Sequence, residues 1–525
     1  MMKSSIRNII VFISSLIILS VLAWLFVFNG YGNLKTDIQS LTEDKTSTVN
    51  IGFIGSKDDF MNAAYSNVNT GLTVLKKDLN YDKSDIVSEI KTSDDGLIWD
   101  FTLKPGLKWS DGSQIKATDI ADIMKNKLDS CDSYACREMK KTIASVSVSD
   151  ATTDINYNTG SLKFTLNKPM ALLPFLLASN EFSITNTTNN ANTDDNNSNA
   201  VSSGAYSVVN SEITDNDGIK LAPDDNTIIL RKNAYYVNPA LSSFIRIELF
   251  NDDASALKAI NDGSVSYVIK DSDVSNANSL DSKKYTVKRG YSTRRTVLVF
   301  NGNLNMDKPL LSDAHVRQGF RQALNNAELM KSLNNDGNVM TNSLLPGSFV
   351  YNADTSYPFD PAHGRYLSTS YFGVRQTRLL WQANRGHAFG EAVDNQLAQI
   401  VQYTKWEEVD DNTYNQMVND KNYEMVLMDM KGIDVFKDLL NGNSLTSIDN
   451  QPDVDTAYAS IYAAKNTDEL KQNIYNMMKA EDEASFIDNL YAHKSTVIKT
   501  NNMNDINADF IDASMNLHDA GASVK

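Results

Sequence analysis

A run of twenty uncharged residues, Ile9 to Phe28, is the strongest constraint that the sequence places on the folded chain. A helix of about 20 apolar residues spans the hydrocarbon core of a bilayer. Lys3 and Arg7 precede this run, and basic residues mark the cytoplasmic end of a membrane segment. The sequence therefore predicts an N-terminal transmembrane helix within residues 1–30, with the rest of the chain outside the cytoplasm.

The apolar run could act as a permanent anchor or as a signal peptide that is removed. Signal peptides usually have a shorter apolar run and a cleavage site between small residues. Here the run is long and ends in VFNGYG, which is a poor cleavage site. The pattern favours an uncleaved signal-anchor that crosses the cell membrane once, followed by a polar spacer at 31–45. The bulk of the chain is then expected at the cell surface or in the periplasm, and a cleaved signal stays open as the alternative.

Length and charge exclude several classes of protein. The 525 residues exceed the size of one ordinary domain, so we expect two or three lobes. The formal net charge is −16, which argues against nucleic acid as a partner, because a basic surface would be hard to assemble. The five histidines are scattered and only two cysteines are present, so we expect no metal site and no cofactor.

The two cysteines, Cys131 and Cys136, lie close together in the sequence CDSYAC. Disulfides persist in the compartments that exported proteins occupy. Spacing alone does not show that the geometry fits a bridge. A Cys131–Cys136 disulfide and a pair of free thiols are therefore both open.

The most informative internal stretch runs from Leu97 to Leu128. Apolar residues alternate from Leu97 to Leu103, which predicts a strand with one buried face. The turn sequences KPG and SDG follow, and apolar residues then recur at helical spacing, with Thr118 as the expected N-cap. Further along the chain, strands alternate with helices, which predicts mixed α/β lobes.

The sequence carries no recognisable catalytic signature. It has no glycine-rich phosphate loop and no serine in the elbow motif of hydrolases. Its histidines lack the spacing of a zinc site. Because no nucleophile and base are paired in the sequence, we expect a protein that is not an enzyme.

The segment DDGLIWDFTLKPGLKWSDGSQIKATDIADIM resembles the signature of the extracellular solute-binding proteins of family 5. These are the peptide- and nickel-type substrate-binding proteins of ABC importers, and include oligopeptide- and dipeptide-binding proteins. Their pattern is roughly DGLTYTFKLRDGVKWSDGTPVTAEDV. The resemblance spans about residues 46–500. Further blocks resemble the family in the same order, at 202–208, 228–268, 298–325, 344–361 and 423–430.

The resemblance implies an α/β, two-lobed fold of the periplasmic-binding-protein type (type II, three-domain cluster). Such proteins close around a ligand like a hinge. Under this interpretation lobe I is built from three separate stretches, an extra domain is attached to it, and the second lobe follows. The expected ranges are 46–70, 160–290 and 481–525 for lobe I, 71–159 for the extra domain, and 291–480 for lobe II.

The resemblance also suggests ligand-binding residues. In the family's peptide binders an aspartate that follows the strand written here as YEMVLMDM holds the ligand's α-ammonium group. That aspartate matches Asp434 with a shift of one residue, or Asp429, and Met430 replaces the family's tryptophan. Asn301 would bond a ligand backbone and Trp381 would line a side-chain pocket. Solvent-exposed aspartates and a tryptophan packed in the core are the alternatives.

The functional expectation is an extracytoplasmic receptor that captures an oligopeptide in an interlobe cleft and delivers it to an ABC permease in the membrane. We expect it to act as a monomer, tethered by its N-terminal helix. A receptor of the same fold for a nickel complex, haem or an oligosaccharide is the first alternative, since the tryptophan of the peptide binders is missing. A sensor or adhesion ectodomain without a transport role is the second.

Overall fold

The computed structural model describes most of the chain from residue 48 onward. The described ranges are 48–150, 160–186, 201–302, 310–333, 337–340, 345–351, 358–372, 376–383, 387–400, 403–430, 452–511 and 514–523. The predicted membrane helix, the spacer at 31–45 and Asp434 lie outside these ranges. Within the described ranges, no helix combines the length and the apolar character needed to cross a membrane.

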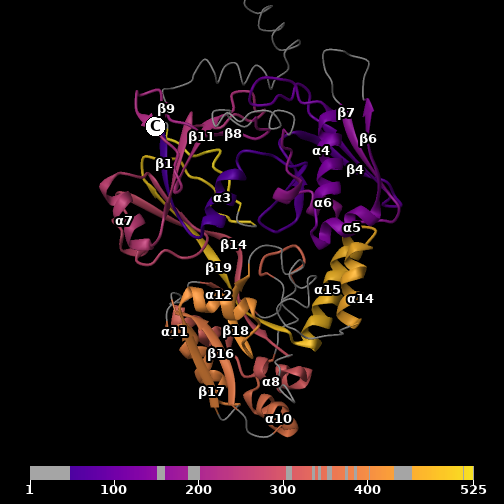
Figure 1. The fold of residues 1–525 in the computed structure, drawn as a ribbon, viewed down its shortest axis with the longest axis vertical. Helices are drawn as coiled ribbons and strands as arrows, with labels where there is room; N and C mark the ends of the chain where they lie inside the picture. The colour runs from indigo at the N-terminus through magenta and orange to yellow at the C-terminus, as the bar shows by residue number, and fades with distance from the viewer. Residues whose placement is uncertain are drawn as a thin grey trace, which may run out of the picture.

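Two long antiparallel strands join an upper and a lower lobe (Figure 1). They are β14 (Tyr285–Phe300) and β19 (Ile487–Thr500), at the centre of a sheet with the order β17-β16-β18-β14-β19-β13-β1-β12-β11-β8. Their register shifts between Tyr291 and Arg295. Residues before the shift belong to the lobe I half of the sheet and those after it pair with lobe II. Because such irregularities bend strands, this is the natural position of a hinge.

The lobe I half of the sheet is built around β1 (Val49–Ile54). This strand runs parallel to β12 (Phe244–Phe250) on one side and to β13 (Tyr267–Lys270) on the other. Every residue of β1 except the half-buried Asn50 is buried, which is typical of a parallel strand that is covered on both faces. The sheet continues through β11 (Thr227–Lys232) and β8 (Tyr206–Val209). The helices described in this lobe are α3 (Lys57–Tyr65) and α7 (Asp253–Asp262). A two-stranded hairpin, β9 (Ile213–Thr214) and β10 (Lys220–Leu221), is attached to it.

The extra domain is a four-stranded antiparallel sheet with the order β4-β5-β7-β6, covered by α4 and α5. Its strands are β4 (Val87–Thr92), β5 (Ile98–Leu103), β7 (Gly160–Leu166) and β6 (Ile143–Asp150), and its helices are α4 (Ala117–Ser130) and α5 (Tyr134–Thr142). The strand predicted from alternation is present as β5, with Trp99 and Phe101 buried and Ile98 exposed. The predicted N-cap at Thr118 is wrong. The helix begins at Ala117, and the Asp119 carboxylate instead accepts from the Lys116 amide at 3.1 Å.

Short elements connect the extra domain to lobe I. The hairpin of β2 (Thr73–Leu75) and β3 (Tyr81–Lys83) precedes its sheet, and α6 (Leu173–Leu176) with the 3₁₀ turn η1 (Asn180–Phe182) follows it. Thr73 donates its hydroxyl proton to the Pro174 carbonyl at 2.6 Å, which ties the entering and leaving segments together.

In the described part of lobe II, three mutually parallel strands continue the sheet beyond β14. β18 (Met425–Met430) pairs with β14 in antiparallel fashion and with β16 (Gln376–Gln382) in parallel, and β17 (Tyr403–Val409) completes the edge. Strands alternate with helices here, as the sequence predicted. The helices of this lobe include α8 (Ala314–Gln322), α9 (Asn326–Leu329), α10 (Pro361–Phe372), α11 (His387–Leu397) and α12 (Asp411–Asn419). A short strand, β15 (Gly337–Val339), pairs with β19.

Two helices bridge lobe II and the extra domain (Figure 1). These are α14 (Pro452–Tyr462) and α15 (Thr467–Ala484), and their apolar residues belong to the same buried cluster as the core of the extra domain. The amide of Ala171 donates to the Ala464 carbonyl at 2.7 Å at this contact. At the other end, buried Arg317 of α8 donates to the Ala484 carbonyl, where a cation complements the dipole of α15. The lobes therefore meet at the crossing strands and again through these helices.

Candidate ligand-binding site

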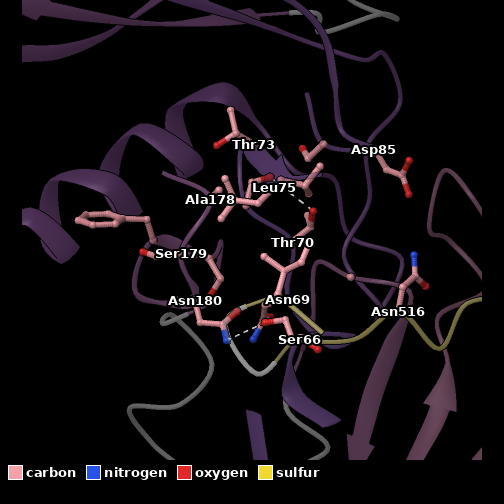
Figure 2. A pocket seen from close by; sticks show the side chains of 18 of the residues that line it. Ser66, Asn69, Thr70, Thr73, Leu75, Asp85, Ala178, Ser179, Asn180 and Asn516 are labelled. Carbon is pink, nitrogen blue, oxygen red and sulfur yellow. Dashed lines mark hydrogen bonds between the residues drawn. The ribbon is translucent and has the colours of Figure 1, made fainter. Parts of the chain in front are cut away.

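A pocket of about 470 Å³ lies where lobe I, the extra domain and the end of α14 come together (Figure 2). Three segments that are distant in sequence build most of its wall. The first follows α3, the second contains α6 and η1, and the third comes from the C-terminal region. They contribute lining residues within 66–75, 172–183 and 507–518, and Tyr462 adds an aromatic side chain from α14.

The lining mixes polar and apolar side chains in a pattern that suits a small organic ligand. Side-chain amides and hydroxyls offer both donors and acceptors, and they include Asn69, Thr70, Ser179, Asn180, Asn507 and Asn516. Apolar and aromatic groups lie among them, including Leu75, Phe175, Phe182, Tyr236, Tyr462 and Met515. Mostly apolar walls with a few placed polar groups are typical of ligand pockets of this size.

Asn67 fixes the C-terminal segment against the start of the pocket. Its side-chain amide donates to the carbonyls of Ala63 and Met515 at 2.9 and 3.1 Å and accepts from the Leu517 amide at 2.8 Å. The side chain is buried, and these bonds use its donors and its acceptor. The wall formed by residues 514–518 is therefore held by hydrogen bonds that cross almost the whole sequence.

The segment SSGAYSV, residues 202–208, supports another part of the pocket wall. Ser203 accepts from the Thr70 amide at 3.1 Å and donates to the Ile184 carbonyl at 2.6 Å. A Cβ atom added to Gly204 would lie 2.7 Å from the Val68 carbonyl oxygen. Only glycine allows the two backbones to approach so closely, which gives a physical reason for glycine in this motif.

Charged groups around the pocket are mostly acidic. Asp85, Glu181 and Asp509 are lining carboxylates, and Lys83 is the lysine among the described lining residues. Lys83 donates to the Ser88 carbonyl at 2.8 Å. Burial and then the neighbouring Asp85 carboxylate raise the pKa of Tyr236 far above its ordinary value, so this phenol stays protonated as a hydrogen-bond donor.

A second cluster of charges lies at the crossing strands. Arg294 of β14 contacts Asp59, Asp271 and Asp429 at 3.0, 3.4 and 3.7 Å. Asp59 and Asp271 belong to lobe I and Asp429 to lobe II. Burial lowers the pKa of Arg294, but the three carboxylates outweigh burial and leave it raised. One guanidinium thus links the lobes where the sheet bends.

Asp429 is the predicted site residue that this cluster contains. Its carboxylate also accepts from the Thr296 hydroxyl at 2.7 Å, and His493 lies 3.5 Å away. It does not line the pocket described above. Its partners are groups of the protein, and a role for it in binding a ligand's ammonium group stays a prediction.

The other predicted site residues lie inside lobe II. Trp381 is buried with Phe389 and Trp406 in the core, the alternative that the sequence left open. Asn301 is buried, and its amide donates to the carbonyls of Lys421 and Tyr423 at 2.9 Å. Met430 is buried in a further apolar cluster of the same lobe. None of the three is among the lining residues of the pocket.

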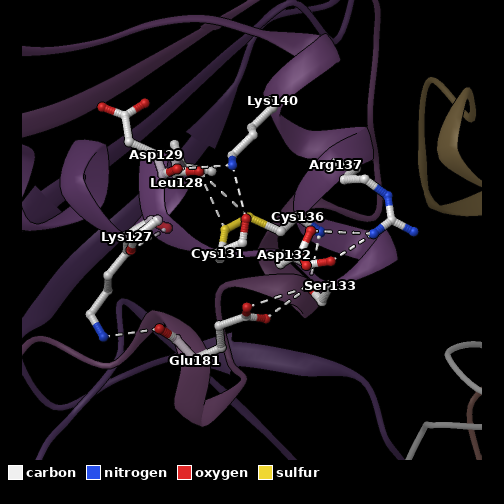
Figure 3. The surroundings of a disulfide bond; sticks show 11 residues. Lys127, Leu128, Asp129, Cys131, Asp132, Ser133, Cys136, Arg137, Lys140 and Glu181 are labelled. Carbon is white, nitrogen blue, oxygen red and sulfur yellow. Dashed lines mark hydrogen bonds and ion pairs between the residues drawn. A yellow bond between two sulfur atoms is a disulfide. The ribbon is translucent and has the colours of Figure 1, made fainter.

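Cys131 and Cys136 are paired as a disulfide, with a Cα–Cα distance of 6.1 Å (Figure 3). This separation lies in the range that disulfides usually span. The bridge closes a short loop at the start of α5, beside Glu181 of the pocket wall. The sequence left this pairing open.

Two lobes joined by a pair of crossing strands, with a ligand-sized pocket beside the junction, define the class of two-lobed solute-binding proteins. The family model described as bacterial extracellular solute-binding proteins, family 5 Middle, matches residues 83–438. The chain belongs to this family of ABC-transporter solute-binding proteins, which confirms the resemblance seen in its sequence. No curated protein matches the sequence significantly.

Solved structures with the same fold share little sequence with this chain. The substrate-binding protein CtaP of Listeria monocytogenes is 16% identical with a TM-score of 0.73, over 92% of this chain and 100% of the other. NikZ of Campylobacter jejuni, in complex with Ni(L-His), is 16% identical with a TM-score of 0.70, over 90% and 99%. DppA of Helicobacter pylori, in complex with the peptide STSA, is 16% identical with a TM-score of 0.67, over 92% and 100%.

Proposed function

We propose that this protein is an extracytoplasmic receptor that captures an oligopeptide in the pocket and delivers it to an ABC permease. The observation that supports the proposal is the composition of the wall. Side-chain amides and hydroxyls alternate with apolar and aromatic groups around a volume of about 470 Å³. A peptide needs such a wall, because its backbone amides must be matched by donors and acceptors when water is excluded.

The N-terminal run from Ile9 to Phe28 completes the proposal. As an uncleaved anchor it would hold a monomeric receptor at the membrane. Tethering raises the effective concentration of a binding module near its partner. The receptor would therefore meet its permease without depending on free diffusion.

Relatives in fold bind different solutes, so the experiment must separate peptides from other ligands. The purified chain is titrated by calorimetry with a pool of random tri- to pentapeptides, with a nickel–histidine complex, and with oligosaccharides. We expect heat of binding with the peptide pool. Binding of the nickel complex or the sugar in its place would contradict the peptide assignment and favour a receptor of the same fold for that solute.

A variant that fills the pocket links binding to this site. Ala178 is a partly buried lining residue that Figure 2 shows at the pocket wall. Ala178→Trp should weaken peptide binding by about tenfold or more, because the indole occupies the space of the ligand. Ile219→Trp is the matched control, since Ile219 is 56% exposed and lies outside the lining. Equal affinity of both variants would place the ligand elsewhere.

A further inference from the structure

We propose that Glu181 is the specificity-determining carboxylate of the pocket, positioned by the Cys131–Cys136 loop to select ligands that carry an ammonium or guanidinium group. The inference rests on the proposed function, because it names the kind of peptide that the same pocket prefers. Figure 3 shows Glu181 facing the disulfide loop. The loop is the segment from Cys131 to Cys136.

The loop holds the Glu181 carboxylate by a direct hydrogen bond. Ser133 donates its hydroxyl proton to the two carboxylate oxygens at 3.1 and 3.4 Å. The same hydroxyl accepts from the Cys136 amide at 3.2 Å and caps α5. Because the disulfide closes the loop on both sides of Ser133, the position of the hydroxyl is restricted.

The loop and the carboxylate belong to the same part of the pocket wall. Ala135 of the loop and Glu181 of η1 are both lining residues. η1 is further fixed by Lys127, which donates to the Glu181 backbone carbonyl at 2.9 Å. A ligand group that reaches this part of the pocket therefore meets a carboxylate that is held from two sides.

The neighbouring cations are engaged with other groups. Lys140 donates to the carbonyls of Asp129 and Cys131 at 3.0 and 2.8 Å, and Arg137 donates to the Asp132 carbonyl at 2.7 Å. Across the described part of the chain, no cation is within ion-pair distance of the Glu181 carboxylate. Lys127 lies close enough for Coulomb attraction to Glu181 but forms no ion-pair contact with its carboxylate, so the carboxylate can still pair with a ligand cation.

The rest of the lining adds to this preference. Asp85 is a further lining carboxylate, Asp509 is one that already pairs with Lys77 at 3.7 Å, and Lys83 is directed to the Ser88 carbonyl. A cationic group on the ligand would gain Coulomb attraction from this wall, and a carboxylate would be repelled. Hydrogen bonds between an ammonium and a carboxylate are also stronger than neutral ones.

A purely structural role for Glu181, as a partner of Ser133, predicts a different result. Glu181→Gln removes the charge but keeps an oxygen that can accept from Ser133. If Glu181 only supports the loop, this conservative variant changes little. If it selects cations, the variant weakens charged ligands and leaves uncharged ones unaffected.

Four tripeptides separate the possible cations on the ligand. They are Ala-Lys-Ala and Ala-norleucine-Ala, each with a free and an acetylated N-terminus, titrated into the purified full chain by calorimetry. Norleucine keeps the length of the lysine stem without its ammonium group. The comparison of lysine with norleucine reports on a side-chain cation, and the comparison of a free with an acetylated N-terminus reports on the α-ammonium group.

We expect Glu181→Gln to weaken at least one peptide that carries a cation by up to about fivefold relative to the matched peptide that lacks this cation, as for one exposed ion pair. Ser133→Ala, and the double variant Cys131→Ser with Cys136→Ser, should also reduce the ratio of the affinity for the peptide with the cation to the affinity for its matched peptide. Glu212→Gln is the control, because this exposed carboxylate pairs with Lys220 outside the pocket. It should leave the ratio unchanged.

The outcomes distinguish this inference from the proposed function. If wild-type protein binds the peptides but Glu181→Gln changes all four equally or not at all, Glu181 does not select cations. If no peptide binds to wild-type protein, the proposed function fails and the inference falls with it. A loss restricted to peptides with one kind of cation supports the inference and identifies the group that Glu181 contacts.

Discussion

Replacing Arg294 by methionine tests whether one guanidinium holds the two lobes together. Methionine keeps a long apolar side chain but leaves the carboxylates of Asp59, Asp271 and Asp429 without their shared cation. The side chains of these carboxylates are only 5, 6 and 12% exposed, and that of Arg294 is 15% exposed. Water therefore compensates little of the lost attraction.

The expected magnitude follows from this burial. Breaking one buried ion pair by removing a partner usually costs about 3–5 kcal/mol. We therefore expect Arg294→Met to lower the free energy of unfolding by about this amount. Burial raises the pKa of Asp271 and Arg294 opposes this effect, so without Arg294 part of the cost should be relieved when Asp271 takes up a proton at low pH.

The assay is urea unfolding followed by circular dichroism, with Arg246→Met as the control. Arg246 contacts Glu248 at 2.7 Å, but the two side chains are 30 and 34% exposed. Surface pairs of this kind contribute about 1 kcal/mol or less. If Arg294→Met shifts the urea midpoint no more than Arg246→Met does, the cluster does not hold the lobes and our reading of the hinge is wrong.

Two further predictions concern stability. Burial raises the pKa of Asp482 to about 7 and that of Asp488 to about 6, while Arg321 opposes both shifts. These folded-state pKa values exceed the ordinary carboxyl value. The protonated carboxyls therefore contribute fully to the free energy of unfolding below about pH 4, and this contribution is lost as the pH rises through 6 and 7. Asp482→Asn should therefore gain stability relative to wild-type protein between pH 5 and pH 8, and parallel urea midpoints over this range would contradict the assignment. Gly204→Ala should lower the melting temperature and also weaken peptide binding, because its Cβ would lie 2.7 Å from the Val68 carbonyl oxygen beside the pocket. An unchanged melting temperature would show that the two backbones can separate at no cost.

Local patterns in the sequence predicted the parts of the fold that depend on local chemistry. The alternation from Leu97 to Leu103 identified a strand because one face of that strand is buried. The helix that follows was found by its spacing, and only its first residue was misplaced. Helix ends depend on which side chain reaches the free amides, and here Asp119 reaches back to the Lys116 amide.

The pocket could not be predicted in this way because its wall is assembled from distant segments. Asn67 binds the backbone of Met515 and Leu517, which lie about 450 residues further along the chain. No periodic pattern reports such a contact. In the sequence, the segment at 202–208 is recognised only as a block that resembles the family, and the close approach of its Gly204 to the Val68 carbonyl appears only in the structure.

Sequence also could not separate ligand contacts from core residues in lobe II. Trp381 has the same apolar pattern whether it faces a ligand or packs on Phe389 and Trp406. Asn301 looks like a free hydrogen-bonding group until the carbonyls of Lys421 and Tyr423 are seen beside it. Such assignments depend on tertiary contacts, which a single sequence does not show.

Native mass spectrometry of the purified chain, before and after exposure to a peptide mixture, tests the central claim most directly. We expect a small adduct that is released on denaturation and sequenced as peptide, with equal occupancy on wild-type protein and Ile219→Trp and clearly lower occupancy on Ala178→Trp at the same subsaturating peptide concentration. An adduct of another chemical class, undiminished occupancy on Ala178→Trp, or no adduct on wild-type protein at saturating peptide would contradict the proposal.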